Sequence, residues 1–291
     1  MADGISVHIG LNSLDPKHYE GWVGRLKACE NDANSMAALC KSQGIAPGKL
    51  LTKKATRQAV LKAIAAASAK LKSGDLFVLT YSGHGGQLPD VSGDEADLQD
   101  ETWCLFDGQL IDDELYYELS RFQAGVRILV LSDSCHSGTV TRAVLGREPG
   151  TRTPDRPLSR LMPPDVARAT YDANKSFYDG LQNALRKRTG AVPEPSGPLE
   201  GVTRRGARIR SKLSAGVILI SGCQDNQESD DGPFNGAFTS QLLTTWNHGA
   251  FKGSHVDFHK KILARMPAYQ SPALFTLGKV TGFLSKRPFT L

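Results

Sequence analysis

The chain has 291 residues, 40% of them hydrophobic, which is enough for a buried core in one large domain. Its formal net charge of +5 reflects 35 Lys and Arg against 30 Asp and Glu. Because no apolar run approaches the roughly 18 residues that span a bilayer, and the N-terminus lacks the layout of a secretion signal, we expect a soluble, cytoplasmic protein without a membrane partner.

Five segments rich in apolar and β-branched residues predict buried strands, at residues 5–11, 76–82, 126–132, 216–221 and 272–276. Apolar residues at helical spacing predict helices over 30–43, ended by Gly44, and over 57–72, where Thr56 can cap the first turn. Alternating strands and helices predict an α/β fold: a mostly parallel central sheet flanked by helices on both faces, with sites at the carboxyl ends of the strands.

Residues 142–212 interrupt this alternation. They hold 8 of the 15 prolines and 15 Lys and Arg against 7 Asp and Glu. We predict a basic, Pro-rich loop or linker between a larger part, 1–141, and a smaller part, 213–291, that completes the same sheet. The basic stretch has neither interleaved aromatic residues nor a recognition helix, so we expect no nucleic-acid partner.

The five cysteines are widely spaced and form no C-x-x-C pair, which favours a reducing compartment over structural disulfides or zinc: Cys29, Cys40, Cys104, Cys135 and Cys223. One of them follows a predicted strand in a turn rich in Ser and Gly, in the sequence SDSCHSG at 132–138. Another strand ends in YSGHGG at 81–86. In a parallel sheet both ends lie at the same edge, so we expect His84 close to Cys135.

A cysteine beside an imidazole is the pattern of a thiol nucleophile. A free thiol is a few per cent thiolate at neutral pH, and a neighbouring histidine activates it. The flanking glycines leave the backbone N–H groups of Gly85 and Cys135 available to bind an oxyanion. An inert, packed core thiol is the alternative, which the His84 turn disfavours. His136 is a second candidate base, but its side chain should point to the opposite face from Cys135.

The two turns resemble those of metacaspases and of their bacterial relatives, the orthocaspases. Two further segments resemble this family: ACENDA at 28–33 and SGCQDNQ at 221–227. A histidine about 50 residues before the cysteine is itself characteristic of caspases, so this spacing is not separate evidence. The resemblance covers both parts of the chain and leaves the linker unmatched. It implies a caspase-like fold and a monomeric cysteine endopeptidase acting on proteins or peptides.

The resemblance implies that Cys135 is the nucleophile and His84 its base. It places Asp32, Ser82 and Asp133 in the S1 pocket, which receives the substrate side chain P1 before the cleaved bond. Asp133 lies two residues before Cys135, on the same strand face, and a buried carboxylate there calls for a cation. We therefore expect cleavage after Arg or Lys, unlike the Asp specificity of true caspases.

Two of the pocket residues have alternative interpretations. Asp32 could instead be an N-terminal cap or a first-turn carboxylate of the helix that it opens. Asp225 could face the substrate in the S1 pocket or stabilise the turn at 224–227 through an Asx-type hydrogen bond. For Ser82 the alternative is simply a small residue at the end of a strand.

The stretch 85–120 holds 11 Asp and Glu and no Lys or Arg. The chemistry needs no cofactor, but metacaspases often bind calcium through carboxylates at comparable places, which implicates Asp97, Asp100, Asp112 and Asp113. This sequence departs from that pattern at Arg142, seven residues after the nucleophile, where another aspartate is expected. The alternative is a solvated acidic loop with a helix cap at Asp112.

Residues 142–212 also contain sites that such a peptidase could cut, among them 186–188 (RKR) and 204–205 (RR). We therefore consider self-processing in the linker, or its use as an occluding plug, against the alternative of a simple tether. Two other functions stay open: a caspase-fold signalling or scaffold module without turnover, and a calcium-binding regulatory domain.

Overall fold

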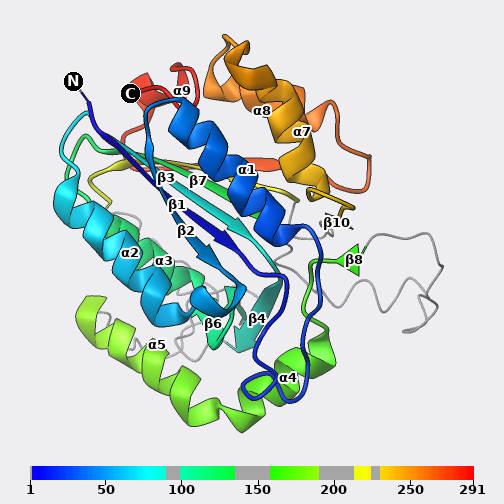
Figure 1. Cartoon of the computed structure of the whole chain (residues 1–291). Helices are drawn as coiled ribbons and strands as arrows, with labels where there is room; N and C mark the ends of the chain where they lie inside the picture. The colour runs from blue at the N-terminus through cyan, green and yellow to red at the C-terminus, as the bar shows by residue number, and fades with distance from the viewer. Residues whose placement is uncertain (1, 90–98, 135–157, 190–212, 224–229) are drawn as a thin grey trace, which may run out of the picture.

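The computed structural model describes residues 2–89, 99–134, 158–189, 213–223 and 230–291. A six-stranded sheet with the order β11-β9-β7-β3-β1-β2 forms the centre (Figure 1). All neighbouring pairs in it are parallel except β11 with β9. Its strands are β1 (Gly4–Gly10), β2 (Ala46–Leu51), β3 (Leu76–Ser82), β7 (Arg127–Asp133), β9 (Gly216–Ser221) and β11 (Ala273–Leu277). The prediction of a mostly parallel central sheet is confirmed.

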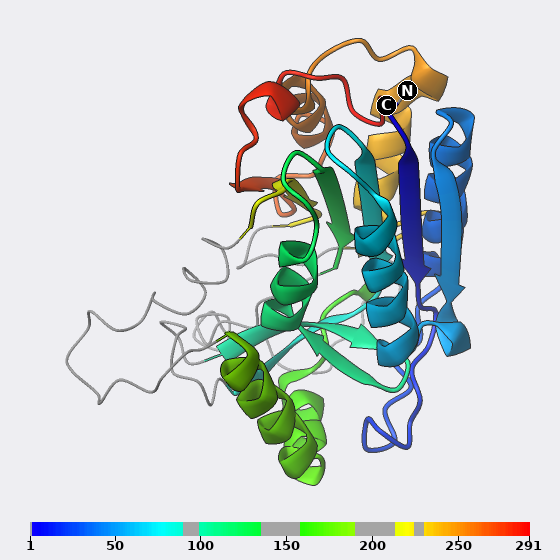
Figure 2. The same cartoon turned by 90° about the vertical axis from the view of Figure 1, so that its left-hand side faces the viewer.

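Helices cover both faces of the sheet, as predicted. One face carries α1 (Cys29–Ser42), α7 (Ala237–Trp246) and α8 (His255–Leu263), and the other carries α2 (Arg57–Lys70) and α3 (Asp112–Ser120). Figure 2 looks onto the face with α2 and α3. Successive residues of β7 enter the two cores in turn, which is why its sequence is apolar throughout: Ile128 and Val130 pack on one side, Leu129 and Leu131 on the other.

Helix boundaries follow from the predicted start and stop residues. The Thr56 side chain accepts a hydrogen bond from the Ala59 backbone N–H at 3.2 Å, so it caps α2 as predicted. Gly44, just after α1, has a φ of +78°, a conformation that glycine adopts without strain. The short remaining elements are the 3₁₀ helices η1 (Thr52–Lys54) and η3 (Asn247–Gly249) and the helix α9 (Thr281–Leu284).

Two groups of strands were not predicted. The edge strand β2 has the sequence APGKLL and is largely exposed, so it lacks the apolar run by which the other strands are recognised. A second, three-stranded antiparallel sheet contains β4 (Gly85–Pro89), β5 (Gln99–Leu105) and β6 (Gly108–Ile111). It begins directly after His84 and contributes one wall beside the carboxyl end of β3.

The segment 142–212, predicted as a basic, Pro-rich loop or linker, contains regular secondary structure in its central part, which the sequence did not predict. There the chain forms β8 (Leu158–Ser159), α4 (Pro164–Ala173) and α5 (Lys175–Thr189). The two helices lie against the three-stranded sheet (Figures 1 and 2). Tyr171 and Tyr178 pack there with Leu88 and Ile111. Among the described helices, none is long and apolar enough to cross a membrane.

Candidate active site

His84 lies where the buried strand β3 ends, and its backbone is held firmly. The His84 carbonyl accepts hydrogen bonds from the Tyr81 hydroxyl at 2.6 Å and from the Cys104 N–H at 2.9 Å. Its ring packs on Trp22, with ring centroids 4.7 Å apart. The strand and the three-stranded sheet therefore fix the position of the imidazole from both sides.

The tautomer of His84 follows from a backbone contact. Its Nε2 lies 3.1 Å from the carbonyl oxygen of Gly24, which can accept but not donate a hydrogen bond. Nε2 therefore carries the proton, and Nδ1 keeps its lone pair. Among the residues that the structure describes, Nδ1 has no hydrogen-bond partner although it is buried. A neutral imidazole with a free Nδ1 has the form of a general base.

Burial also favours the neutral form of His84. Desolvation lowers the pKa of its imidazole from 6.5 to about 3; the hydrogen bond to Gly24 opposes this shift, and the charge of Arg160 adds to it. The ring is therefore uncharged at neutral pH in this arrangement.

The predicted nucleophile Cys135, with its neighbour His136, lies outside the described residues, as do Asp97, Asp225 and Arg142. Cys135 directly follows Ser134, a buried residue after β7. The other four cysteines are buried: Cys29, Cys40, Cys104 and Cys223. Burial raises the pKa of the Cys29 and Cys40 thiols to about 12, which makes both poor nucleophiles.

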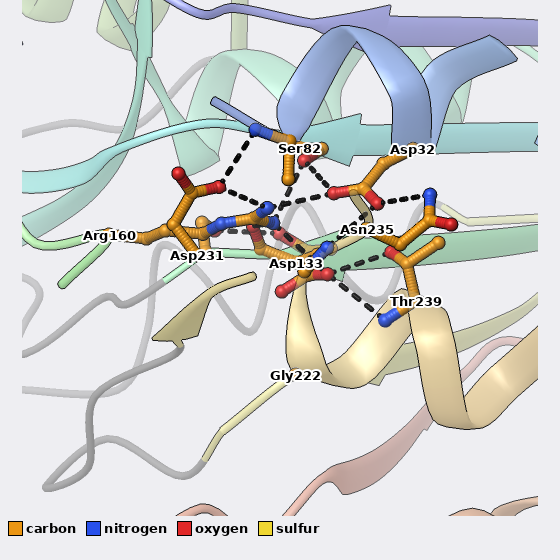
Figure 3. A network of polar contacts seen from close by, with 12 residues as sticks. Asp32, Ser82, Asp133, Arg160, Gly222, Asp231, Asn235 and Thr239 are labelled. Atoms are coloured by element: carbon orange, nitrogen blue, oxygen red, sulfur yellow. Dashed lines mark hydrogen bonds and ion pairs between the residues drawn. The ribbon is translucent and has the colours of Figure 1, made fainter. Parts of the chain in front are cut away.

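The structure brings the three predicted pocket residues together (Figure 3). Ser82 and Asp133 are paired across β3 and β7, and the Ser82 hydroxyl donates to Asp32 Oδ2 at 2.7 Å. Asp32 does not cap α1, because its other oxygen accepts from the Asn235 side chain at 2.8 Å and from the Gly236 N–H at 3.0 Å. It lies in the first turn of α1, as its alternative interpretation had it, but makes no capping hydrogen bond there.

A cation that was not predicted fills this pocket. The Arg160 side chain is fully buried, and its guanidinium lies 2.8 Å from Asp32, 3.0 Å from Asp133 and 3.0 Å from Asp231. Its Nη1 also donates to the Ser82 hydroxyl at 2.8 Å and to the Asp133 carbonyl at 3.0 Å. The guanidinium can be buried because the carboxylates pair with its charge and because both of its terminal nitrogens donate hydrogen bonds.

Asp231 is a third pocket carboxylate that the sequence did not reveal. It belongs to the short strand β10 (Asp230–Asp231) and accepts hydrogen bonds from the Lys27 N–H at 2.6 Å and the Ala28 N–H at 3.1 Å. Those two N–H groups precede α1, where backbone donors are unpaired and the helix dipole is positive.

The far wall of the pocket is shaped by α7. Asp133 accepts from the N–H of Thr239 at 3.1 Å and from its hydroxyl at 2.7 Å, which fixes the carboxylate. At Gly236 a Cβ atom would lie 2.4 Å from Nη2 of Arg160, so the absence of a side chain makes room for the guanidinium. Burial raises the pKa of the Asp32 carboxyl, an effect that Arg160 opposes and Asp133 reinforces.

The backbone N–H of Gly85, the predicted oxyanion donor, also has a partner. It donates to the carbonyl oxygen of Arg160 at 2.9 Å. This donor adjoins His84 and begins β4. The carbonyl group of Arg160 and its side chain are therefore bound at the same time, one by Gly85 and the other by the carboxylates.

Three of the candidate calcium ligands lie among the described residues: Asp100, Asp112 and Asp113. Asp100 and Asp113 are buried, at β5 and at the start of α3, and Asp112 accepts a hydrogen bond from the Asp113 N–H at 2.8 Å. Within the described parts of the chain, no three residues of the His, Cys, Asp and Glu types come together as a metal site would require. Asp97 lies outside the described residues, so calcium binding by this stretch stays a prediction.

Known proteins are similar to this chain. A family model described as "Caspase domain" matches residues 14–279. Metacaspase-1 of Saccharomyces cerevisiae is 30% identical over 259 residues, covering 80% of this chain and 56% of that protein. For metacaspase-1 of Schizosaccharomyces pombe the identity is 30% over 258 residues, with the same coverage. The chain thus spans just over half the length of these curated relatives.

A solved structure is similar over nearly the whole chain. It is the crystal structure of protein GSU0716 from Geobacter sulfurreducens, which is 49% identical and superposes with a TM-score of 0.82. The similarity covers 99% of this chain and 98% of that one, and so includes the segment unmatched by the sequence motifs.

Proposed function

The chain belongs to the family of caspase domains, and from this premise we propose that it is a cysteine endopeptidase that cleaves peptide bonds after Arg, and less well after Lys. Cys135 is the nucleophile in this proposal and His84 the base. Its substrates are proteins or peptides, as the peptidase family implies.

One observation carries the P1 specificity: three carboxylates and a hydroxyl surround a guanidinium next to the histidine. Such a pocket repels an Asp side chain and binds a cation. Arg160 uses both terminal nitrogens, Nη1 towards Asp133 and Ser82, Nη2 towards Asp32 and Asp231. Lys has a single ammonium group and lacks this planar fork, so Arg is the better P1 residue.

In this proposal each residue of the site has its own role in peptide hydrolysis. Nδ1 of His84 takes the thiol proton of Cys135, and the thiolate attacks the carbonyl carbon of the P1 residue. The N–H of Gly85 stabilises the negative oxygen of the tetrahedral intermediate, together with the N–H of Cys135. His84 then gives its proton to the leaving amine, and water hydrolyses the thioester with His84 again as base.

The carbonyl of Gly24 supports each of these proton transfers. The Gly24 carbonyl accepts the hydrogen bond of Nε2–H and so keeps Nδ1 on the side of the ring away from Gly24. The same carbonyl stabilises the imidazolium that forms transiently.

Trapping with a peptidyl ketone that carries Arg at P1 tests the proposal. The wild-type chain should gain one equivalent of the reagent, with Cys135 as the modified residue in a peptide map. Cys135→Ala should neither be labelled nor hydrolyse an Arg peptide. Labelling at another cysteine, or hydrolysis by Cys135→Ala, would contradict the assignment. Parallel assays with calcium and with a chelator decide whether the acidic stretch acts as a metal site.

A further inference from the structure

Residues 158–162 (LSRLM) run along the candidate site in an extended conformation. On one side of Arg160, β8 pairs antiparallel with β10, with Ser159 opposite Asp230 and Leu158 opposite Asp231. An extended chain added to a strand edge is a common way for peptidases and other proteins to hold a peptide.

On the other side of Arg160 the chain is held as well. The Met162 N–H donates to the carbonyl of Gly85 at 2.8 Å, and Leu161 forms a parallel bridge with Gly85. The Met162 side chain is buried, with its sulfur 3.7 Å from that of Cys104. The bond between Arg160 and Leu161 is therefore anchored both upstream and downstream.

Arg160 makes two of the contacts that a P1 residue would make at this site. Its side chain fills the carboxylate pocket, and its carbonyl oxygen accepts the Gly85 N–H at 2.9 Å, next to His84. The hydrogen bond from the Gly85 N–H belongs to the bridge between Gly85 and Leu161, and this bridge brings the Arg160 carbonyl to the predicted oxyanion donor. The two contacts together place the Arg160 carbonyl group where a substrate would present its scissile bond.

We infer that residues 158–162 are the enzyme's own first substrate and that the chain cuts itself between Arg160 and Leu161. This inference rests on the proposed function. The Sγ of Cys135 bonds to the carbonyl carbon of Arg160, the C–N bond to Leu161 breaks, and the thiol proton passes through His84 to the new amine. Water then hydrolyses the thioester, leaving a carboxylate on Arg160 and restoring the thiol.

The inference also concerns regulation. While Arg160 is in the pocket, no other P1 side chain can enter, so the uncut chain is blocked. Arg186 is a poorer site because it lies within α5, whose backbone is hydrogen-bonded. After the cut, the parts before and after residue 160 stay paired through β7 and β9 of the central sheet.

Intact mass and N-terminal sequencing during incubation test the inference, alongside hydrolysis of a P1 Arg peptide. The wild type should give a smaller fragment that begins at Leu161, and Cys135→Ala should stay whole. Because the segment lies in its own chain's site, the first-order rate should not change when the protein is diluted about a hundredfold. A first cut elsewhere, or an intact chain that hydrolyses the peptide through Cys135, overturns the inference and leaves the proposed function standing. An intact chain that is also inert towards the peptide and the ketone counts against both.

Three variants sharpen this test. Arg160→Lys keeps the charge in the pocket and should cut itself at least about tenfold more slowly, the effect of losing one charge-assisted hydrogen bond. Arg160→Ala should lose the cut at 160 and hydrolyse added Arg peptides without the lag of the wild type. The control is Arg168→Ala, since that side chain is 86% exposed on α4 and should behave as wild type. Unchanged self-cleavage in both Arg160 variants would overturn the inference.

Discussion

At the scale of single residues, Gly24 determines how His84 works. Its carbonyl fixes the tautomer, and its φ of +54° lets the backbone approach the ring. A Cβ atom at this position would lie 3.1 Å from Cδ2 and 3.2 Å from Nε2 of the imidazole. Gly24 is a positioning residue: it acts on the substrate through His84.

We therefore expect Gly24→Ala to displace the His84 ring and lower kcat by about 10- to 100-fold, with little change in KM. Steady-state kinetics with an Arg peptide measures this. Gly21→Ala is the matched control, because Gly21 has a φ of +87° and nothing within 4 Å of its added Cβ. Equal kcat values for the two variants would show that strain, and not contact with His84, is responsible.

Asp231 has a distinct expected effect, since it contacts the P1 side chain and not the base. Asp231→Asn should lower kcat/KM for P1 Arg peptides by roughly 10- to 100-fold, the loss of one charge-assisted hydrogen bond. Labelling of Cys135 by a small, uncharged alkylating agent should be little affected. The control is Asp172→Asn, whose side chain is 65% exposed on α4. An unchanged kcat/KM in Asp231→Asn would exclude this carboxylate from substrate binding.

Residues beside a recognisable motif could be predicted, and residues reached through long-range contacts could not. Ser82 and Asp133 lie within two residues of His84 and Cys135, and a parallel sheet necessarily brings these strand ends together. Asp231 and Gly24 reach the site through turns whose path depends on the complete fold. Arg160 was one of 15 basic residues in its segment, and charge alone did not distinguish it.

At the scale of elements, α5 anchors the segment that follows Arg160. Its Tyr178 hydroxyl lies 2.6 Å from His18 Nε2 and accepts from the Gln109 N–H at 3.2 Å, while its ring is buried. The helices α4 and α5 were missed because Pro163 and Pro164 stand at the start of α4 and because most of the buried side chains of the two helices carry polar groups: Thr170, Tyr171, Tyr178 and Gln182. Such residues do not form a clear apolar stripe.

Tyr178→Phe should lower the free energy of unfolding by about 1–3 kcal/mol, because it leaves a buried N–H without its acceptor. Urea unfolding followed by fluorescence measures this change. Tyr117→Phe on α3 is the control, since the Tyr117 side chain is partly exposed. A loss in Tyr178→Phe no larger than in the control would mean that the hydroxyl contributes no net stability to the docking of α5.

At the scale of the whole molecule, three buried histidines couple stability to pH. Burial lowers the pKa of His8 and His84 to about 3 and that of His255 to about 4. All three are neutral when folded, and all three are protonated in the unfolded chain below its pKa of about 6.5. The unfolded state therefore binds more protons, so stability falls as pH decreases below about 6.5.

Near pH 5 the three histidines should contribute an uptake of about three protons on unfolding. Free energies of unfolding from urea titrations between pH 7 and pH 5 give this number as a slope. In His8→Asn the slope should fall by about one proton, or about 1.4 kcal/mol per pH unit, whatever the effect of the substitution at pH 7. An identical slope in wild type and His8→Asn would show that His8 does not contribute.

The most direct test of the account is the P1 preference of the self-processed wild-type enzyme. It is measured as kcat/KM for peptides that differ in P1 alone and carry Arg, Lys or Asp. The three carboxylates around Arg160 predict the order Arg above Lys, with a ratio of at least about ten, and no cleavage after Asp. Cleavage after Asp, or equal rates for the three peptides, would contradict the account of the pocket.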